Sequence, residues 1–470
     1  MKLTINVLTG FAISLLLASC SKDYLTKVPA NALPQTEAIQ TEADLLTVTS
    51  GIYSGLRATD LYWRTLPLKG DIMADNAFVT TSNSNRYISF NNFNFTTADA
   101  YATNIWTNAY VVIKNANNAI NAAVPASVNA DQYKGEAYAI RALMYFELVR
   151  NYARPFTLAP NDPGVPVVTT FNYEEKPARS SVKDVYTQIL SDLNKAYSLM
   201  TMYRGSAYFS KYGARALEAK VYQTMGDWEK AKMAALDVVT KGGFTLTSSS
   251  GYVAYWNNAS VRSDKIETIF EVASDVANNN AFDQIGYIYL TKGGGYGDIL
   301  ATKQLYDLFA PTDVRKQLIL DSTRRGQAGR AYLNIKYSNA AGSGDKDDTK
   351  VLRFSDVVLI LAEAYYNTGE RANALKYLNQ VAQQRDPSFA GYTSSTEQLL
   401  EDILTERRKE LAFEGDRLWD LVRLGRSWTK ISNENPYRKI DVTADNKYLI
   451  FPIPQVELDA NPSVTQNPGY

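Results

Sequence analysis

The sequence contains no histidine and only one cysteine. Without an imidazole, the protein cannot form a Ser-His-Asp triad, a Cys-His pair or a histidine-ligated zinc hydrolase site. A single thiol cannot form a disulfide within the chain. The 49 Lys and Arg residues balance 49 Asp and Glu residues, so no basic surplus is available to attract a nucleic acid. These absences exclude several common hydrolytic sites and argue against a nucleic-acid partner.

Aromatic residues are abundant instead, with 32 Tyr, 17 Phe and 6 Trp among 470 residues. A tyrosine ring has a flat apolar face and a polar tip, which suits ligand binding more than proton transfer. The chain is longer than the roughly 250–300 residues at which one hydrophobic core stops growing. We therefore expect either two subdomains or one body built from repeats.

The N-terminus has the features of a bacterial lipoprotein signal. Lys2 precedes a mostly apolar stretch over residues 5–18, which is too short to span a membrane but has the length of a signal-peptide core. Residues 16–20, which end in Cys20, resemble a lipobox, in which the cysteine becomes the acylated N-terminus. We predict a signal peptide over residues 1–19, a lipid anchor on Cys20 and a lead segment over residues 20–40. The mature protein is then expected to be anchored on a membrane surface.

Apolar residues recur at helical spacing in several segments. The clearest pattern lies at positions i, i+4, i+7, i+8, i+11 and i+15, starting at Ile105 and ending at Ile120. Comparable patterns cover residues 41–58, 131–152, 182–200, 212–240, 355–384 and 397–424. The sequence therefore predicts a mainly α fold.

Two of these segments repeat one another at an offset of 143 residues (362 − 219). In each copy a small residue lets two helices approach, a tyrosine fills the gap, a glycine ends the first helix and an alanine seats the second. The matched positions are Ala219, Tyr222, Gly226 and Ala231 in one copy and Ala362, Tyr365, Gly369 and Ala374 in the other.

The spacing favours helical hairpins of the tetratricopeptide type, with generic hairpins as the alternative. We predict such helices over about 41–58, 101–243 and 350–426, within a body that extends from residue 41 to residue 470. Irregular segments over about 71–100 and 244–300 are predicted to carry ligand-binding loops and short strands, one of them near residues 266–273.

A series of motifs resembles those of a known family. One helical segment carries Trp106, Tyr110 and Asn117, and the run over residues 407–421, RRKELAFEGDRLWDL, is the most distinctive. The chain closes with Asn-Pro-Gly-Tyr at residues 467–470. Together these motifs resemble the SusD/RagB-like outer-membrane lipoproteins of Bacteroidetes over nearly the whole chain.

The resemblance implies a SusD-like fold and a cell-surface protein without catalytic activity. Such proteins capture an oligosaccharide or polysaccharide, or a peptide in some members, and deliver it to a SusC-like TonB-dependent transporter. The expected partners are that transporter, a glycan and outer-membrane lipid through Cys20. No cofactor is expected.

Acidic residues raise one alternative, a carboxylate-based surface glycoside hydrolase. The segment from Glu406 to Arg426 places carboxylates beside arginines at helical spacing, and opposite charge keeps a carboxylate ionised. This pattern favours an ion-pair network over a general acid. Asp345, Asp347 and Asp348 could supply oxygens to calcium, but they lack the twelve-residue calcium-loop pattern and are interpreted as a solvated acidic loop.

Sugar recognition requires rings beside side chains that hydrogen-bond to hydroxyl groups. Two stretches outside the predicted helices offer this mixture, and any single ring in them has core packing as its alternative role. Asn83 and Asn280 lie in the same stretches. The predicted ligand-binding residues are Asn76, Phe78, Arg86, Tyr87, Asp283, Tyr287, Tyr289 and Tyr296.

Overall fold

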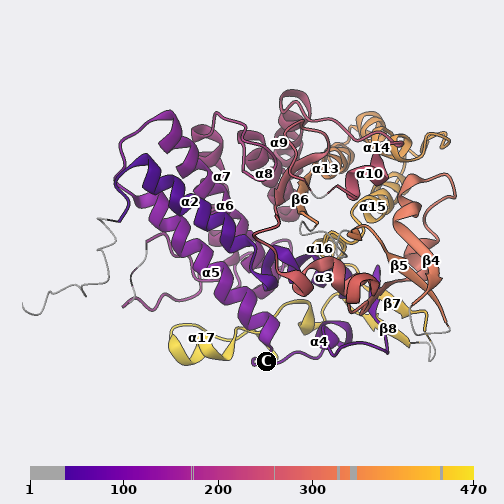
Figure 1. The fold of residues 1–470 in the computed structure, drawn as a ribbon, viewed down its shortest axis with the longest axis horizontal. Coiled ribbons are helices and arrows are strands. Elements are labelled where there is room, and N and C mark those ends of the chain that lie inside the picture. Colours follow the sequence, from indigo (N-terminus) through magenta and orange to yellow (C-terminus); the bar gives the residue numbers. More distant parts are fainter. Residues whose placement is uncertain are drawn as a thin grey trace, which may run out of the picture.

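Helices make up most of the computed structural model, which describes residues 38–470 apart from 171, 173, 259, 325–328, 339–346 and 435–437. The predicted mainly α fold is confirmed (Figure 1). The longer helices are α2 (Glu42–Leu56), α3 (Thr65–Ile72), α5 (Ala100–Asn121), α6 (Val128–Tyr152), α7 (Val182–Leu199), α8 (Lys211–Met225), α9 (Trp228–Lys241), α13 (Phe354–Asn367), α14 (Arg371–Arg385), α15 (Gln398–Glu410) and α16 (Arg417–Arg423). Shorter helices are α4 (Ile88–Asn92), α10 (Tyr252–Trp256), α11 (Ile285–Tyr289), α12 (Lys303–Tyr306) and α17 (Gln455–Ala460).

Polar residues define where several of these helices begin. The side chains of Ser127, Ser181 and Ser210 each accept a hydrogen bond from a backbone N–H in the first turn of α6, α7 and α8. Thr41 and Asp44 form a reciprocal capping box at the start of α2. Such caps satisfy N–H groups that have no partner within the helix. The helix starts predicted from apolar spacing lie close to the observed ones.

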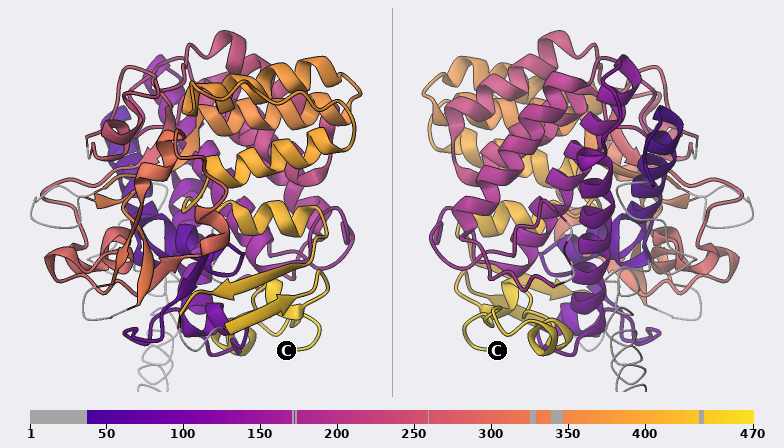
Figure 2. Two further views of the ribbon diagram at one scale, coloured as in Figure 1. Left: turned by 90° about the vertical axis from the view of Figure 1, so that its right-hand side faces the viewer. Right: turned by 90° about the vertical axis from the view of Figure 1, so that its left-hand side faces the viewer.

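The repeated motif forms two helical hairpins, as predicted. Gly226 and Gly369 adopt left-handed backbone conformations, with φ of 74° and 84°, between α8 and α9 and between α13 and α14. The alanines of both copies are buried, and α9 packs against α13, so the hairpins stack on each other. In Figure 2, the orange helices α13 and α14 lie in layers above α15 and α16.

One helical prediction is wrong in its extent. The pattern over residues 397–424 is not one continuous helix, because the chain turns between α15 and α16. Phe413 and Gly415 have φ values of 65° and 87° in this turn, and a helix cannot continue through the left-handed region. Helix α3 packs against this turn.

The strands form three small sheets among the described residues. Strands β1, β3, β5 and β4 form an antiparallel sheet in that order, β2 pairs with β6, and β7 pairs with β8. The strand predicted near residues 266–273 is confirmed as β2. The strands are β1 (Ala77–Val79), β2 (Thr268–Val272), β3 (Ile299–Ala301), β4 (Ile319–Thr323), β5 (Arg330–Asn334), β6 (Thr349–Arg353), β7 (Trp428–Ser432) and β8 (Arg438–Val442).

The pairing of β1 with β3 joins the two irregular segments that the sequence singled out. Ala77 lies opposite Ala301 and Val79 lies opposite Ile299. Residues near 80 and near 298 are therefore neighbours, although more than two hundred residues separate them in the chain. In the part of the chain that the structure describes, no helix is both long and apolar enough to cross a membrane.

Helix α3 approaches the turn between α15 and α16 at backbone contact. A Cβ atom added to Gly70 would lie 1.8 Å from the carbonyl oxygen of Gly415, and one added to Gly415 would lie 2.7 Å from Pro67 Cα. Only glycine permits this approach, because any side chain at either position would collide with backbone.

We predict that Gly70→Ala lowers the free energy of unfolding by about 3 kcal/mol or more, at the upper end of the range for overpacked sites. Gly51→Ala in α2 is the matched control, because no atom lies within 4 Å of its added Cβ. Because alanine favours a helix more than glycine does, Gly51→Ala should raise the free energy of unfolding by up to about 1 kcal/mol. Urea denaturation measures both, and equal stabilities of the two variants would refute the contact.

Candidate functional site

The carboxylates of the 406–426 segment belong to a buried ion-pair network. Glu410 is fully buried and accepts hydrogen bonds from Arg353 at 2.9 Å, Arg385 at 3.0 Å and Arg315 at 3.0 Å. Glu267 receives Arg353 and Arg385 from its other side, each at 2.9 Å. We call these five side chains the Glu410 network.

Charge in the Glu410 network keeps its acids ionised. Burial alone would raise the pKa of Glu410, but Arg385, Arg353 and Arg315 together hold that pKa well below its ordinary value. A carboxylate that remains ionised has no proton to donate to a leaving group. The ion-pair interpretation of this segment is therefore confirmed.

The rest of the charged segment also pairs within the protein. Arg407 bridges Asp356 and Asp420, and Arg423 forms two hydrogen bonds of 2.7 Å to Glu363. These contacts link α15 and α16 to α13. Arg408 and Arg417 both reach Asp75, just beyond α3, so the same segment also holds the chain that leads into β1.

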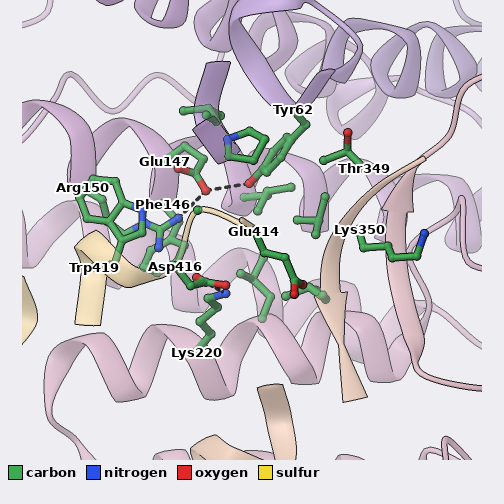
Figure 3. Close-up of a pocket in the computed structure, with 17 residues that line it drawn as sticks. Tyr62, Phe146, Glu147, Arg150, Lys220, Thr349, Lys350, Glu414, Asp416 and Trp419 are labelled. Carbon is green, nitrogen blue, oxygen red and sulfur yellow. Dashed lines mark hydrogen bonds and ion pairs between the residues drawn. The ribbon is translucent and has the colours of Figure 1, made fainter. Parts of the chain in front are cut away.

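A small chamber beside this network is too small to hold a sugar (Figure 3). Its volume is about 40 Å³, far below the several hundred Å³ of small-molecule sites. Tyr62 donates a 2.7 Å hydrogen bond to Glu147, and Lys220 pairs with Asp416 at 2.6 Å across the chamber wall. We interpret the chamber as part of the polar interior rather than as a binding site.

An open groove of about 450 Å³ is a better candidate. It lies beyond the end of α2, between the kinked segment η2 (Thr59–Trp63), helix α5 and residues 277–280. The Arg57 guanidinium lies 5.9 Å from the centre of the Trp63 ring. The polar and aromatic side chains that line the groove are those of Arg57, Trp63, Asn108, Asn278, Asn279 and Asn280.

The groove combines an aromatic ring with several amides, which both donate and accept hydrogen bonds. Asn280 is partly engaged, because its Nδ2 donates to Thr59 Oγ1 at 3.0 Å. The Asn108 side chain has no hydrogen-bond partner among the described residues. The amides can hydrogen-bond to sugar hydroxyl groups, and the Trp63 ring, which is only 6% exposed, forms part of the wall behind them.

Five of the predicted ligand-binding residues are buried and are occupied by contacts within the protein. Tyr87 stacks on Tyr101 with ring centres 4.8 Å apart, and Tyr289 stacks on Tyr337 at 6.1 Å. Asn76 and Phe78 are likewise inaccessible. The prediction of direct ligand contact is therefore not supported for Asn76, Phe78, Tyr87, Tyr287 and Tyr289.

None of the other predicted ligand-binding residues lines the groove. Asp283 pairs with Arg64 at 2.5 Å, directly after Trp63. Phe282 is 53% exposed and packs on the buried ring of Tyr287 at 4.9 Å. The pair between Arg64 and Asp283 places the second predicted stretch against the end of η2.

The first predicted stretch contacts the second through a cation–π contact. The Arg86 guanidinium lies 3.8 Å from the centre of the Tyr296 ring, and neither side chain is fully buried. Arg86 also donates to Ser84 at 2.7 Å. The structure thus brings together parts of both stretches, but Arg57, Trp63 and Asn108, which line the groove, were not among the predicted contacts.

The loop with Asp345, Asp347 and Asp348, which the sequence analysis interpreted as solvated, is buried where the structure describes it. Asp347 and Asp348 are buried rather than solvated, and Asp348 accepts a 2.7 Å hydrogen bond from the Ser274 backbone N–H. Asp345, like Cys20 and the signal segment, lies outside the described residues. Within the described ranges, no cluster of three or more acidic or cysteine side chains has an arrangement that could hold a metal ion.

Lys430 anchors the chain that leads toward Arg86. Its Nζ donates to the Ile72 carbonyl at 2.5 Å and to Asn91 Oδ1 at 2.6 Å. The same Asn91 oxygen accepts the backbone N–H of Val79 at 3.0 Å. Burial without a carboxylate partner among the described residues lowers the pKa of Lys430 to about 7.

The chain is similar to SusD proteins over most of its length. A model of the SusD family matches residues 320–470, and a model described as starch-binding, associating with the outer membrane, matches residues 23–223. SusD-like protein P38 of Formosa agariphila is 25% identical, with 97% of each chain covered. A SusD superfamily structure from Bacteroides vulgatus is 26% identical, with a TM-score of 0.84 over 92% of this chain and 100% of that chain. Another, from Bacteroides thetaiotaomicron, is 26% identical, with a TM-score of 0.83 over 91% of this chain and 100% of that one.

We predict that Glu410→Gln lowers the free energy of unfolding by about 3–5 kcal/mol, because it leaves buried arginines without their countercharge. The control is Glu401→Gln in the same helix, whose pair with Arg426 is partly exposed and should contribute only about 0–1 kcal/mol. Chemical denaturation at neutral pH separates the two. Similar losses in both variants would show that the buried ion pairs of Glu410 contribute no more to stability than the partly exposed pair of Glu401.

A second prediction concerns pH. Because the pKa of Lys430 falls to about 7 on folding, the unfolded chain binds a proton above pH 7 that the folded chain lacks. The free energy of unfolding should therefore rise with pH above 7, by up to about 1.4 kcal/mol per pH unit for this residue. Lys430→Met should remove that part of the slope. Lys69, whose pKa is also lowered to about 7 by burial, should still contribute its own part.

Lys439→Met is the control for the pH experiment. Lys439 lies on the neighbouring strand β8 with its side chain 55% exposed, so its removal should leave the slope unchanged. Denaturation curves recorded at several pH values above neutrality provide the slopes. An unchanged slope in Lys430→Met would contradict the assignment of a neutral buried amine.

Proposed function

The chain belongs to the SusD family, and we propose that it is a cell-surface protein that binds a glycan and delivers it to a SusC-like TonB-dependent transporter. The family description as starch-binding and associated with the outer membrane supports binding of a carbohydrate. The open groove beside Trp63 carries the proposal, because it combines a guanidinium group and several amides in one accessible cavity, with the largely buried Trp63 ring in its wall.

We propose binding without catalysis. The carboxylates of the Glu410 network are buried among arginines, and the exposed Asp283 is held by Arg64. A glycosidase needs two carboxyl groups on opposite sides of the scissile bond, one of them protonated. The polar lining of the groove also favours a sugar over an extended peptide, which would pair with an exposed strand edge.

The proposal is tested by calorimetric titration against plant, host and microbial polysaccharides and a peptide digest. One class of polysaccharide should bind, and Asn108→Ala should weaken that binding about three- to tenfold, the value of one hydrogen bond. Asn115→Ala, two turns further along α5 and outside the groove, should bind as the original protein does. Heat from the peptides alone, or hydrolysis of any polysaccharide, would overturn the proposal.

We further propose that Cys20 is acylated and anchors the protein in the outer membrane, at the cell surface. The motif around Cys20 and the family description support this location. An acylated protein partitions into the detergent phase when a mild detergent solution is warmed past its cloud point. Cys20→Ser should shift the protein to the aqueous phase, because the lipid attachment is lost. A Cys20→Ser variant that stays in the detergent phase would argue against this anchor.

A further inference from the structure

A second groove lies on the other side of α5. Its volume is about 420 Å³, and it is bounded by α5, by the chain around Pro166 and Pro177, and by α17. Apolar surface from Tyr110 and the two prolines forms part of its wall, and Lys114 and Glu457 add charge. Nothing in the family comparison assigns a role to this groove.

The two grooves meet at one residue. Val111 lines both of them and is 44% exposed, so part of its side chain is open to solvent between the two cavities. Asn108 faces the first groove, whereas Thr107 and Lys114 face the second. Only the ridge of one helix, about 10–12 Å wide, therefore separates the two cavities.

The second groove, like the first, has an aromatic ring and polar side chains in its lining. The Tyr110 hydroxyl donates to the Pro166 carbonyl at 2.8 Å, which fixes the ring as part of the wall. Trp106 Nε1 donates to Glu457 at 3.2 Å, which ties α17 to α5. A rigid apolar wall beside an ammonium and a carboxylate can cover the C–H groups of a sugar ring and hydrogen-bond to its hydroxyls.

We propose that the two grooves form one continuous track for an extended glycan chain, which crosses α5 at Val111. This inference rests on the proposed function and narrows its ligand to chains long enough to occupy both grooves. A chain held in the first groove presents its next sugar units to the second at high effective concentration, so the second contact adds affinity without a new encounter.

The test uses oligosaccharide ladders from disaccharide to octasaccharide of the malto, laminari, xylo and manno series, each with its parent polysaccharide. In the series that binds, affinity should first rise as the oligosaccharide fills the first groove. It should rise a second time, by about tenfold or more, once the chain is long enough to cross α5 and enter the second groove. Thr107→Arg places a large side chain in the second groove from an exposed helical position and should abolish this second rise. Thr47→Arg, exposed on α2 and outside both grooves, is the control.

The outcomes separate this inference from the proposed function. Binding that is weakened in Asn108→Ala but shows no second rise with length, and no effect of Thr107→Arg, would overturn the track and leave the glycan-binding proposal standing. Failure of every ladder and polysaccharide to bind would overturn both. A second rise that disappears in Thr107→Arg and persists in Thr47→Arg supports the track.

Discussion

The convergence of three arginines on Glu410 and Glu267 is the constraint on which the rest of the structure depends. These five side chains come from regions between residues 267 and 410, and each is buried. Withdrawal of ions from water costs several kcal/mol each, and the cost is offset only when every charge has its partner in good geometry. The network therefore fixes the chain just before β2, strand β6, helix α14 and helix α15 relative to one another, and it links the helical hairpins to the inserted strands.

The position of the groove follows from that arrangement. Helix α15 ends at Glu410, and the turn after it holds α3 at the backbone contact between Gly70 and Gly415. Segment η2, with Trp63, directly precedes α3. One wall of the groove is thus fixed by the buried charges, and α5 supplies the facing wall.

Much of the fold could be predicted because helices and helical hairpins are encoded locally. Apolar periodicity located α5 to α9, and the glycines at 226 and 369 located the turns of two hairpins. The groove was not predictable in this way, because Trp63, Asn108 and Asn280 meet only after folding. The prediction that Tyr87 and Tyr289 contact a ligand failed for a physical reason. Both rings stack on other aromatic rings in the core, and stacking is also how a tyrosine at the surface would contact a sugar.

The walls of the groove differ in how readily their sequences can change. Two of its walls, η2 and α5, are tied into the packed body, whereas Asn278, Asn279 and Asn280 lie in an irregular segment between β2 and α11. Changes in that segment do not disturb the core, because loops accept substitution and insertion more readily than packed elements. Substitutions in this segment can therefore change the lining of the groove while the scaffold that displays it stays the same.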